Sequence, residues 1–312
     1  MISFGPIPSR RLGKSLGINN IPSKKKCSYS CIYCQVGITK ECTITRETFY
    51  EPGVIYAEVK KHLTKLNDTD RPDYLTFVSN GEPTLDINLG ESIIKLKAFN
   101  IPVAVITNSS LLSNRNVRDG LKHADWVSIK VDTSCENTWK KINSPLIGLY
   151  FKKHVDGLLQ FSSEYQGKLV TETMLVEGIN DTSEELQRTS GLIAQIKPSL
   201  AFISIPTRPP AISSVRAPFE TAINEAFQIF SNTGLKTELL VGFEGTNIGY
   251  TGNVVDDIIN ISSVHPIRED TMMELLLKDK ADDSILISLI QNKIIKQVQY
   301  NSEKFYIRHF NI

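Results

Sequence analysis

Residues 27–34 read CSYSCIYC, and this segment places Cys27, Cys31 and Cys34 within eight residues. The segment follows a short apolar run at residues 16–21, so the three thiols lie in a loop after a predicted strand. Packing does not explain thiols at such close spacing, whereas zinc ions and iron–sulfur clusters both bind thiolates. A structural zinc ion almost always takes four ligands, but a cubane cluster held by three cysteines keeps one iron open. The count of three therefore favours a catalytic cluster.

The two other cysteines leave an alternative open. Cys42 lies eight residues after Cys34 and could serve as the fourth ligand of a zinc site. Otherwise Cys42 and Cys135 are expected to be ordinary, partly buried thiols. An odd total of five cysteines in a reducing compartment argues against a disulfide framework.

On both sides of the cysteine loop, short β-branched runs alternate with segments of helical period. Ile55, Val59 and Leu63, for example, fall on one stripe of a helix. Six strands are predicted, at residues 16–21, 73–78, 103–107, 126–131, 169–176 and 200–205. The pattern indicates an α/β fold with a parallel sheet. Periodicity alone does not choose between a partial (β/α)6 barrel and an open doubly wound sheet.

The last part of the chain has a different pattern, which predicts a small winged-helix-like domain after a connecting segment. The predicted division is a barrel at residues 1–243, a connecting segment at 244–264 with a helix near 253–261, and a carboxyl-terminal domain at 265–312. The predicted elements of that domain are helices at 269–278 and 283–292 and strands at 294–299 and 304–309. Its seven basic and seven acidic side chains cancel, so duplex DNA binding is not expected. We expect the domain to cover the barrel or to shape the substrate entrance.

Composition excludes several classes of protein. The 312-residue chain is 41% hydrophobic, which suffices for a sizeable core and excludes disorder as the main state. No apolar stretch approaches the roughly 20 residues of a membrane span, and the charged start MISFGPIPSRR lacks the apolar segment of a signal peptide. The sequence therefore predicts a cytoplasmic protein without membrane contact. A net charge of +1 provides no strong overall field for nucleic acid.

The cysteine segment, with Tyr33 just before its third cysteine, resembles the cluster loop of the radical S-adenosylmethionine superfamily. NGEP at residues 80–83 is similar to the GGEP segment of that family, with Asn80 in place of the first glycine. Further similar segments are TNSS at 107–110, SIKVD at 128–132 and TETMLVEGIND at 171–181. GPIPSRRLGKSLGINNIP at 5–22, PTRPP at 206–210 and HPIRED at 265–270 resemble a wyosine-synthase-like subgroup of the superfamily.

This resemblance implies a partial (β/α)6 barrel that carries a [4Fe–4S] cluster on Cys27, Cys31 and Cys34. S-adenosylmethionine would bind the open iron, and one electron from a flavodoxin- or ferredoxin-type donor would cleave it to methionine and a 5′-deoxyadenosyl radical. The resemblance assigns Tyr33 to the adenine. It assigns the remaining cofactor contacts to Asn80, Gly81 and Glu82 for the methionyl amine, and to Asn108, Lys130 and Asp132 for the ribose or carboxylate.

The substrate is predicted only by class. Arg10, Arg11 and residues 24–26 flank the expected mouth of the site, and Arg208 follows the sixth predicted strand on a stiff, proline-rich segment. Such cations suit an anionic substrate such as tRNA or a phosphorylated metabolite. Modification of an RNA nucleoside is the first hypothesis, and modification of a small metabolite or peptide is the second. A non-catalytic, zinc-stabilised nucleic-acid-binding protein is the alternative from a different class. The five scattered histidines are expected to be surface or capping residues.

Overall fold

The computed structural model describes residues 2–22, 24–242, 245–246 and 248–309. Within them, eight strands form one curved sheet in the order β1-β2-β5-β6-β7-β8-β9-β10. The strands are β1 (Ser3–Ser9), β2 (Gly13–Ile18), β5 (Tyr74–Phe77), β6 (Val103–Thr107), β7 (Trp126–Lys130), β8 (Lys168–Met174), β9 (Leu200–Ser204) and β10 (Thr237–Leu240). Strands β2 to β10 of this sheet run parallel, and β1 pairs antiparallel with β2 at one edge. The sheet is therefore a partial barrel with an antiparallel edge strand.

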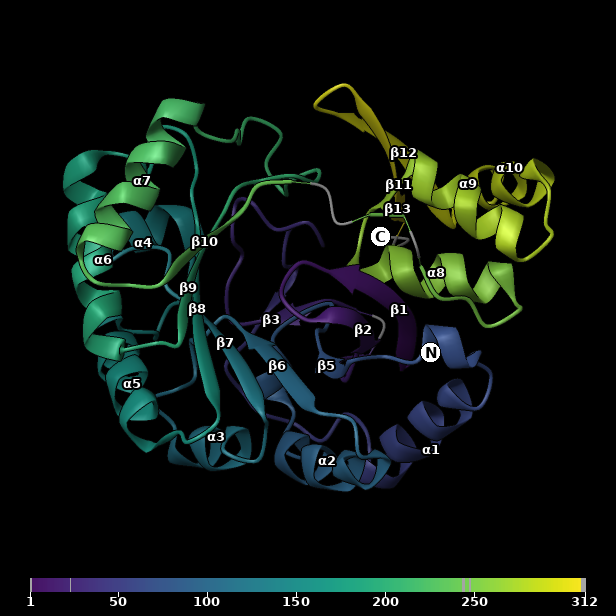
Figure 1. The fold of residues 1–312 in the computed structure, drawn as a ribbon, viewed down its shortest axis with the longest axis horizontal. Helices are drawn as coiled ribbons and strands as arrows, with labels where there is room; N and C mark the ends of the chain where they lie inside the picture. Colours follow the sequence, from purple (N-terminus) through teal and green to yellow (C-terminus); the bar gives the residue numbers. More distant parts are fainter. Residues whose placement is uncertain (1, 23, 243–244, 247, 310–312) are drawn as a thin grey trace.

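Helices connect the parallel strands and lie along the outer face of the sheet (Figure 1). They are α1 (Pro52–Leu63), α2 (Leu89–Leu96), α3 (Arg115–Leu121), α4 (Glu136–Asn143), α5 (Phe151–Glu164), α6 (Ser183–Ile196) and α7 (Glu220–Asn232), with short 3-10 turns at Asp68–Asp70, Pro83–Leu85 and Lys97–Phe99. The main core packs the apolar stripes of these helices against strands such as Leu75–Phe77 of β5 and Val103–Val105 of β6. None of the helices in the described ranges combines the length and hydropathy of a membrane span.

The prediction of a partial (β/α)6 barrel is confirmed, and all six predicted strands are present. Two further strands, β1 and β10, were missed. Strand β1 contains Pro6 and Pro8, which are tolerated because it lies at the edge of the sheet. Strand β10 is only four residues long and has Leu240 as its one fully buried residue, because it forms the opposite edge of the sheet.

The carboxyl-terminal elements form a second, smaller unit beside β1 (Figure 1). They are α8 (Val254–Val264), β11 (Ile267–Arg268), α9 (Glu269–Lys278), α10 (Asp283–Gln291), β12 (Ile295–Tyr300) and β13 (Glu303–Arg308), and the strands pair in the order β11-β13-β12. This order of helices and strands is typical of a winged helix. Side chains of α8, α9 and α10 share one apolar cluster with Phe4 and Ile7 of β1. The unit is thus packed on the barrel edge, and the predicted domain limits stay a prediction.

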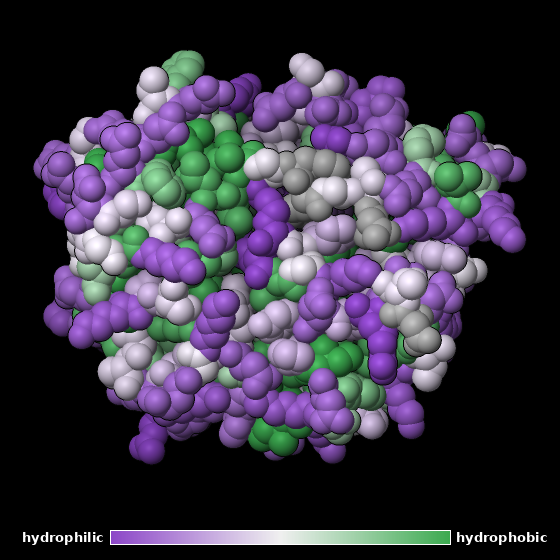
Figure 2. All heavy atoms as spheres, in the orientation of Figure 1, coloured by the Kyte–Doolittle hydropathy of each residue, from purple (hydrophilic) through white to green (hydrophobic). Residues whose placement is uncertain are grey.

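The surface of the molecule is mostly polar. On the face shown in Figure 2, hydrophilic side chains cover most of the rim, and larger apolar areas lie inward from it. Such a distribution is ordinary for a folded chain, so single exposed apolar side chains need no explanation and groups of them are the more informative feature.

Candidate active site

A cavity of about 240 Å3 lies where the parallel strands β5 to β9 end. Active sites of β/α barrels are built at this end of the strands, because the loops that follow several strands converge there. The polar residues and cysteines that line the cavity are Arg10, Arg11, Cys27, Cys31, Tyr33, Cys34, Gln35, Ser79, Glu82, Thr107, Asn108, Lys130, Glu172, Ser204, Thr207 and Arg208. The cysteine loop therefore faces the strand ends, as the sequence predicts.

The cysteine loop is anchored at its start by a short parallel pair, β3 (Lys26–Cys27) and β4 (Glu41–Cys42). A tight turn follows, in which the backbone N–H of Cys34 donates to the carbonyl of Cys31 at 3.1 Å. This turn directs Cys31 and Cys34 to the same cavity as Cys27. Cys42 is the strand partner of Cys27 but is not among the residues that line the cavity.

Each of the three sulfurs accepts one side-chain N–H from a different part of the chain. The amide of Asn108, after β6, donates to Cys27 Sγ at 3.4 Å, and the amide of Asn143, at the end of α4, donates to Cys31 Sγ at 3.5 Å. The ammonium of Lys25 lies 3.2 Å from Cys34 Sγ. N–H donors stabilise the negative charge of a thiolate, and cysteines that bind a cluster are thiolates.

The three thiols fit an iron–sulfur cluster. Burial raises the pKa of Cys27, and it raises the pKa of Cys31 to about 12, so both hold their protons until a metal replaces them. In the part of the chain that the structure describes, no three Cys, His, Asp or Glu side chains meet closely enough to hold a single metal ion. A cubane binds each cysteine through a different iron, so it requires three sulfurs that are held apart around one cavity.

The NGEP segment follows β5 and passes close behind the cysteine loop. The backbone N–H of Glu82 donates to the carbonyl of Lys26 at 3.0 Å, and a Cβ atom on Gly81 would lie 1.8 Å from that same oxygen. Only glycine fits there. Asn80 is buried, its side chain donates to the carbonyl of Pro22 at 3.3 Å, and it does not line the cavity. Asn80 therefore holds the loop rather than facing the cofactor position.

The carboxylate of Glu82 is buried and well supplied with donors. One oxygen accepts from the hydroxyls of Thr84 and Thr107 at 2.7 and 2.6 Å, and the other accepts from the backbone N–H of Asn108 at 2.7 Å. Burial raises the pKa of Glu82, although these hydrogen bonds oppose that rise. Glu82 lines the cavity, and within the described residues its second oxygen accepts from that one N–H, which suits the carboxylate to a cationic amine.

A buried charge network forms the floor of the cavity between β7 and β8. Lys130 lies 3.0 Å from Glu172, its register partner, and 3.9 Å from Asp132. Glu172 also pairs with Arg11 and accepts a hydrogen bond from Ser204 at 3.0 Å. Burial opposes ionisation, but Arg11 and Lys130 outweigh it and lower the pKa of Glu172. The network therefore stays charged at neutral pH.

Asp132 supports the site from behind. Its carboxylate accepts from the hydroxyl of Tyr33 at 2.5 Å and from the amide of Asn143 at 2.7 Å, and it does not line the cavity. The Tyr33 ring in turn lies under the Lys130 ammonium, which is 5.1 Å from the ring centroid. Tyr33 and Lys130 are thus fixed at the cavity wall, with Asp132 as their positioning group.

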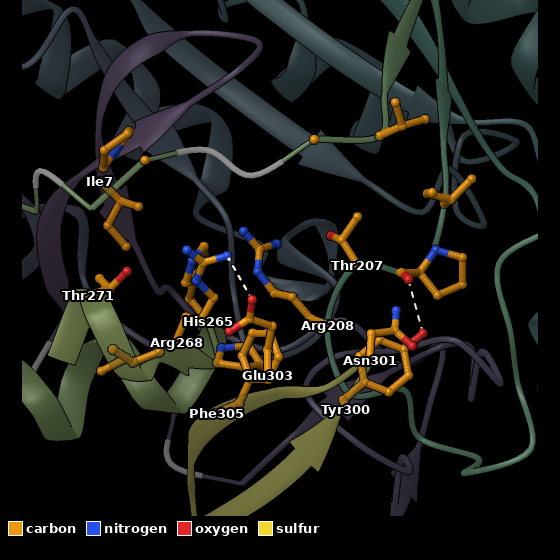
Figure 3. Close-up of a pocket in the computed structure, with 18 of the residues that line it drawn as sticks. Ile7, Thr207, Arg208, His265, Arg268, Thr271, Tyr300, Asn301, Glu303 and Phe305 are labelled. Atoms are coloured by element: carbon orange, nitrogen blue, oxygen red, sulfur yellow. Dashed lines mark hydrogen bonds and ion pairs between the residues drawn. The ribbon is translucent and has the colours of Figure 1, made fainter. Parts of the chain in front are cut away.

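A second pocket of about 220 Å3 adjoins the first and is closed by the carboxyl-terminal unit. The two pockets share Ile205, Pro206, Thr207 and Arg208, the loop after β9. Figure 3 shows the side chains of Arg208, His265 and Arg268 directed toward the same part of this pocket. The hydroxyl of Tyr300 donates to the carbonyl of Pro206 at 3.0 Å, and Arg268 lies 3.7 Å from Glu303 (Figure 3).

Some predicted site residues lie elsewhere. The lysines at 24–26, expected at the mouth of the site, each face a different partner: Lys24 pairs with Glu41, Lys26 pairs with Glu47, and Lys25 faces Cys34. The prediction that all histidines are surface or capping residues is wrong for His62 and His154, which are buried. Both lie in contacts that only the folded chain creates, such as the 2.9 Å hydrogen bond between His62 and Ser3.

Sequence reasoning missed Glu172, Gln35 and Asn143, and it placed Lys25 at the substrate mouth instead of beside Cys34. The sequence did indicate Glu172. It is a charged residue in a mostly apolar strand, and it lies two positions before Met174, so both side chains point to the same face of the sheet and line the cavity. Gln35 accepts from Arg208 at 2.9 Å across 173 positions, and no local pattern indicates such a pair.

Residues 21–189 match the family model described as the Radical SAM superfamily. The chain belongs to the radical SAM superfamily. It is similar to the UPF0026 protein MJ1312 of Methanocaldococcus jannaschii, with 41% identity over 99% of this chain and 96% of that protein.

Two solved structures are also similar to this chain. SuiB from Streptococcus suis, bound to S-adenosylmethionine, matches 72% of this chain and 48% of that chain with 10% identity and a TM-score of 0.52, which shows a common fold. A structure of TYW1 with a lysine-pyruvate adduct bound covers 96% of this chain and 82% of that chain, with 14% identity and a TM-score of 0.45, too low to add to the argument.

Membership decides between the two interpretations of the cysteine loop. The protein is a radical SAM enzyme that uses a [4Fe–4S] cluster and S-adenosylmethionine, so the zinc alternative is not retained. Enzymes of this superfamily need a one-electron donor such as flavodoxin or ferredoxin. The resemblance to the wyosine-synthase-like subgroup stays a prediction.

Proposed function

We propose that Cys27, Cys31 and Cys34 hold the [4Fe–4S] cluster and that S-adenosylmethionine lies in the adjoining cavity. When bound, the cluster would supply one-electron reductive cleavage of S-adenosylmethionine, which gives methionine and a 5′-deoxyadenosyl radical able to remove hydrogen from the substrate. The support for this assignment is that the three thiols, alone among the five cysteines, share one cavity with the strand ends.

The chain's own residues bind and orient the cofactor. Glu82 offers its second carboxylate oxygen to the methionyl amine, and Tyr33 offers a fixed ring face to the adenine. Gly81 allows its own backbone to lie against the cysteine loop and within reach of the cofactor, because it has no side chain to separate the two segments. Asn108 and Lys130 lie on the same wall and are placed to meet the ribose or carboxylate.

For the substrate, the proposal is an RNA nucleoside, which reacts in the cluster cavity while its flanking phosphates extend into the second pocket. The observation that carries this is the shared wall of the two pockets at residues 205–208, with Arg208 on it. Arg208 donates to the neutral amide of Gln35, whereas Arg268, beyond it, already pairs with Asp270 and Glu303. A single small metabolite would use one pocket only, whereas a nucleotide within a chain needs a site that continues past the reacting group. Guanidinium groups suit phosphate because they donate two parallel N–H bonds.

The test compares modified nucleosides from cells with and without the protein by mass spectrometry. A nucleoside that disappears on deletion, and that reappears when purified protein, S-adenosylmethionine and dithionite act on RNA from the deletion strain, supports the proposal. Unchanged RNA together with a changed small metabolite or peptide would favour the second candidate substrate class.

A further inference from the structure

The loop between α4 and α5 lies directly on the outer side of the cysteine loop. The backbone N–H of Leu146 donates to the carbonyl of Ser28 at 3.0 Å, and the N–H of Ser30 donates to the carbonyl of Ser144 at 3.1 Å. A further bridge joins Tyr29 to Pro145. The two loops therefore move as one body, and residues that protrude from the 144–150 loop are close to the cysteine ligands.

Two large apolar side chains protrude from this loop. Ile147 is 98% exposed and Tyr150 is 63% exposed. Ile38, which is 59% exposed, lies beside the same cysteine loop, because the neighbouring Thr39 hydroxyl donates to the carbonyl of Tyr29 at 2.7 Å. A single exposed apolar side chain is ordinary, but these three lie beside one loop, and grouped apolar side chains are typical of surfaces that meet another molecule.

Basic side chains surround the apolar ones. Between residues 136 and 156, the exposed charged groups are Lys140, Lys141, Lys152 and Lys153, against Glu136 and Asp156. The acids pair with Lys140 and Lys152 along their own helices, and these exposed pairs are weak. This segment therefore carries an excess of two exposed positive charges, with basic residues on both sides of its apolar residues in the sequence, and this favours an acidic partner.

An aromatic cluster fills the space between this surface and the cysteines. Tyr29 and Trp139 lie with ring centroids 5.8 Å apart and share a 3.0 Å hydrogen bond, and Phe151 lies 5.5 Å from Trp139. Cys27 and Cys31 belong to the same packed cluster. A dry, rigid layer of this kind supports electron transfer between an outer partner and the thiolate-bound irons, because transfer weakens steeply with distance.

The surface is separate from the substrate site. None of residues 136–156, all of which the structure describes, lines the cavity or the second pocket. A partner docked on this side therefore leaves both pockets open to cofactor and substrate. An RNA would instead be expected to follow the pockets.

We propose that the surface around Ile147, Tyr150, Lys152 and Lys153 is the docking site of an acidic one-electron carrier protein of the flavodoxin or ferredoxin class. The proposal rests on the proposed cluster at Cys27, Cys31 and Cys34. In the step, the carrier is oxidised by one electron and the [4Fe–4S] cluster goes from the 2+ to the 1+ state. Interfaces between enzymes and electron carriers are small, and opposite charges speed the association of the two proteins. The surface proposed here, one loop and two helix ends, is correspondingly small.

The experiment compares Ile147→Asp and the double variant Lys152→Glu/Lys153→Glu with two matched controls far from the cysteine loop. The controls are Leu277→Asp on α9, where Leu277 is 77% exposed, and Lys60→Glu/Lys61→Glu on α1. Cleavage of S-adenosylmethionine is measured with flavodoxin hydroquinone and with dithionite. Dithionite is a small reductant and does not need the docking surface. Affinity for oxidised flavodoxin and for a [2Fe–2S] ferredoxin is measured separately by calorimetry at low and high salt.

We expect both surface variants to lose at least tenfold in carrier affinity and in carrier-driven cleavage, while dithionite-driven cleavage stays within twofold of the wild type. The affinity of the wild type should fall as salt rises. Equal losses in the controls, or wild-type affinity in the surface variants, would overturn the docking site. RNA binding lost in the surface variants with carrier binding intact would assign the surface to RNA and also overturn it. Failure of the wild type with dithionite would count against the proposed function instead.

Discussion

Gly81 shows how strongly a single residue constrains the site. A Cβ atom there would overlap the carbonyl of Lys26, so Gly81→Ala must push the NGEP segment away from the cysteine loop. We expect this variant to retain less than half of the wild-type iron after anaerobic reconstitution. Gly53→Ala on α1 is the matched control, because a Cβ there meets open space and alanine favours helix by about 0.5–1 kcal/mol. Normal iron content in Gly81→Ala would contradict this prediction and would mean that the cysteine loop adjusts to the added Cβ atom.

The cysteines differ in function despite identical chemistry. Replacing Cys27, Cys31 or Cys34 by Ala should abolish the cluster, because each lines the cavity with its own N–H donor. Cys42→Ala and Cys135→Ala should keep it. Iron and sulfide analysis of the five variants gives the test, and loss of iron in Cys42→Ala would mean that the neighbour of Cys27 is a ligand.

Lys25 is expected to tune the cluster. Its ammonium lies at Cys34 Sγ, and positive charge and N–H donation at a ligand sulfur favour the reduced, more negative state. Lys25→Met should therefore lower the reduction potential of the cluster, with Lys25→Arg close to the wild type. Potentiometric titration followed by EPR measures this directly. An unchanged potential in Lys25→Met would contradict it.

At the scale of elements, we expect the junction of α4, α5 and the cysteine loop to lose stability in acid. His154 at the start of α5 is buried beside Trp139, and burial lowers its pKa to about 4 from 6.5. The unfolded chain thus binds this proton more readily, so stability is complete above pH 6.5 and is lost as pH falls toward 4. The loss amounts to about 3 kcal/mol.

Urea unfolding of the cluster-free protein from pH 7 to 4 tests this prediction. His154→Phe should flatten the decline in the free energy of unfolding, since an apolar ring replaces the group that titrates. His123→Phe, at an exposed position, should leave the decline unchanged. Parallel declines in the wild type and in His154→Phe would assign the acid sensitivity to other groups.

At the scale of the whole molecule, the barrel and the carboxyl-terminal unit meet over β1 and at the second pocket. Tyr300→Phe removes the one hydroxyl that joins β12 to Pro206, at a cost of about 1 kcal/mol in the free energy of unfolding. We expect turnover of the true substrate to fall more than dithionite-driven cleavage of S-adenosylmethionine alone, because the proposed function places only the substrate in the second pocket. Equal losses in both reactions would mean that the carboxyl-terminal unit takes no part in substrate binding.

The sequence by itself determined the alternation of strands and helices, the cysteine loop and the order of the carboxyl-terminal elements, because periodicity, spacing and turn residues act locally. Only the tertiary structure decided which residues meet. Arg11 pairs with Glu172 across 161 positions, and Asn108 reaches Cys27 across 81. The sequence did not predict strands β1 and β10, because edge strands lack the continuous apolar pattern of buried strands. Long-range partners follow from the curvature of the sheet, which no local pattern records.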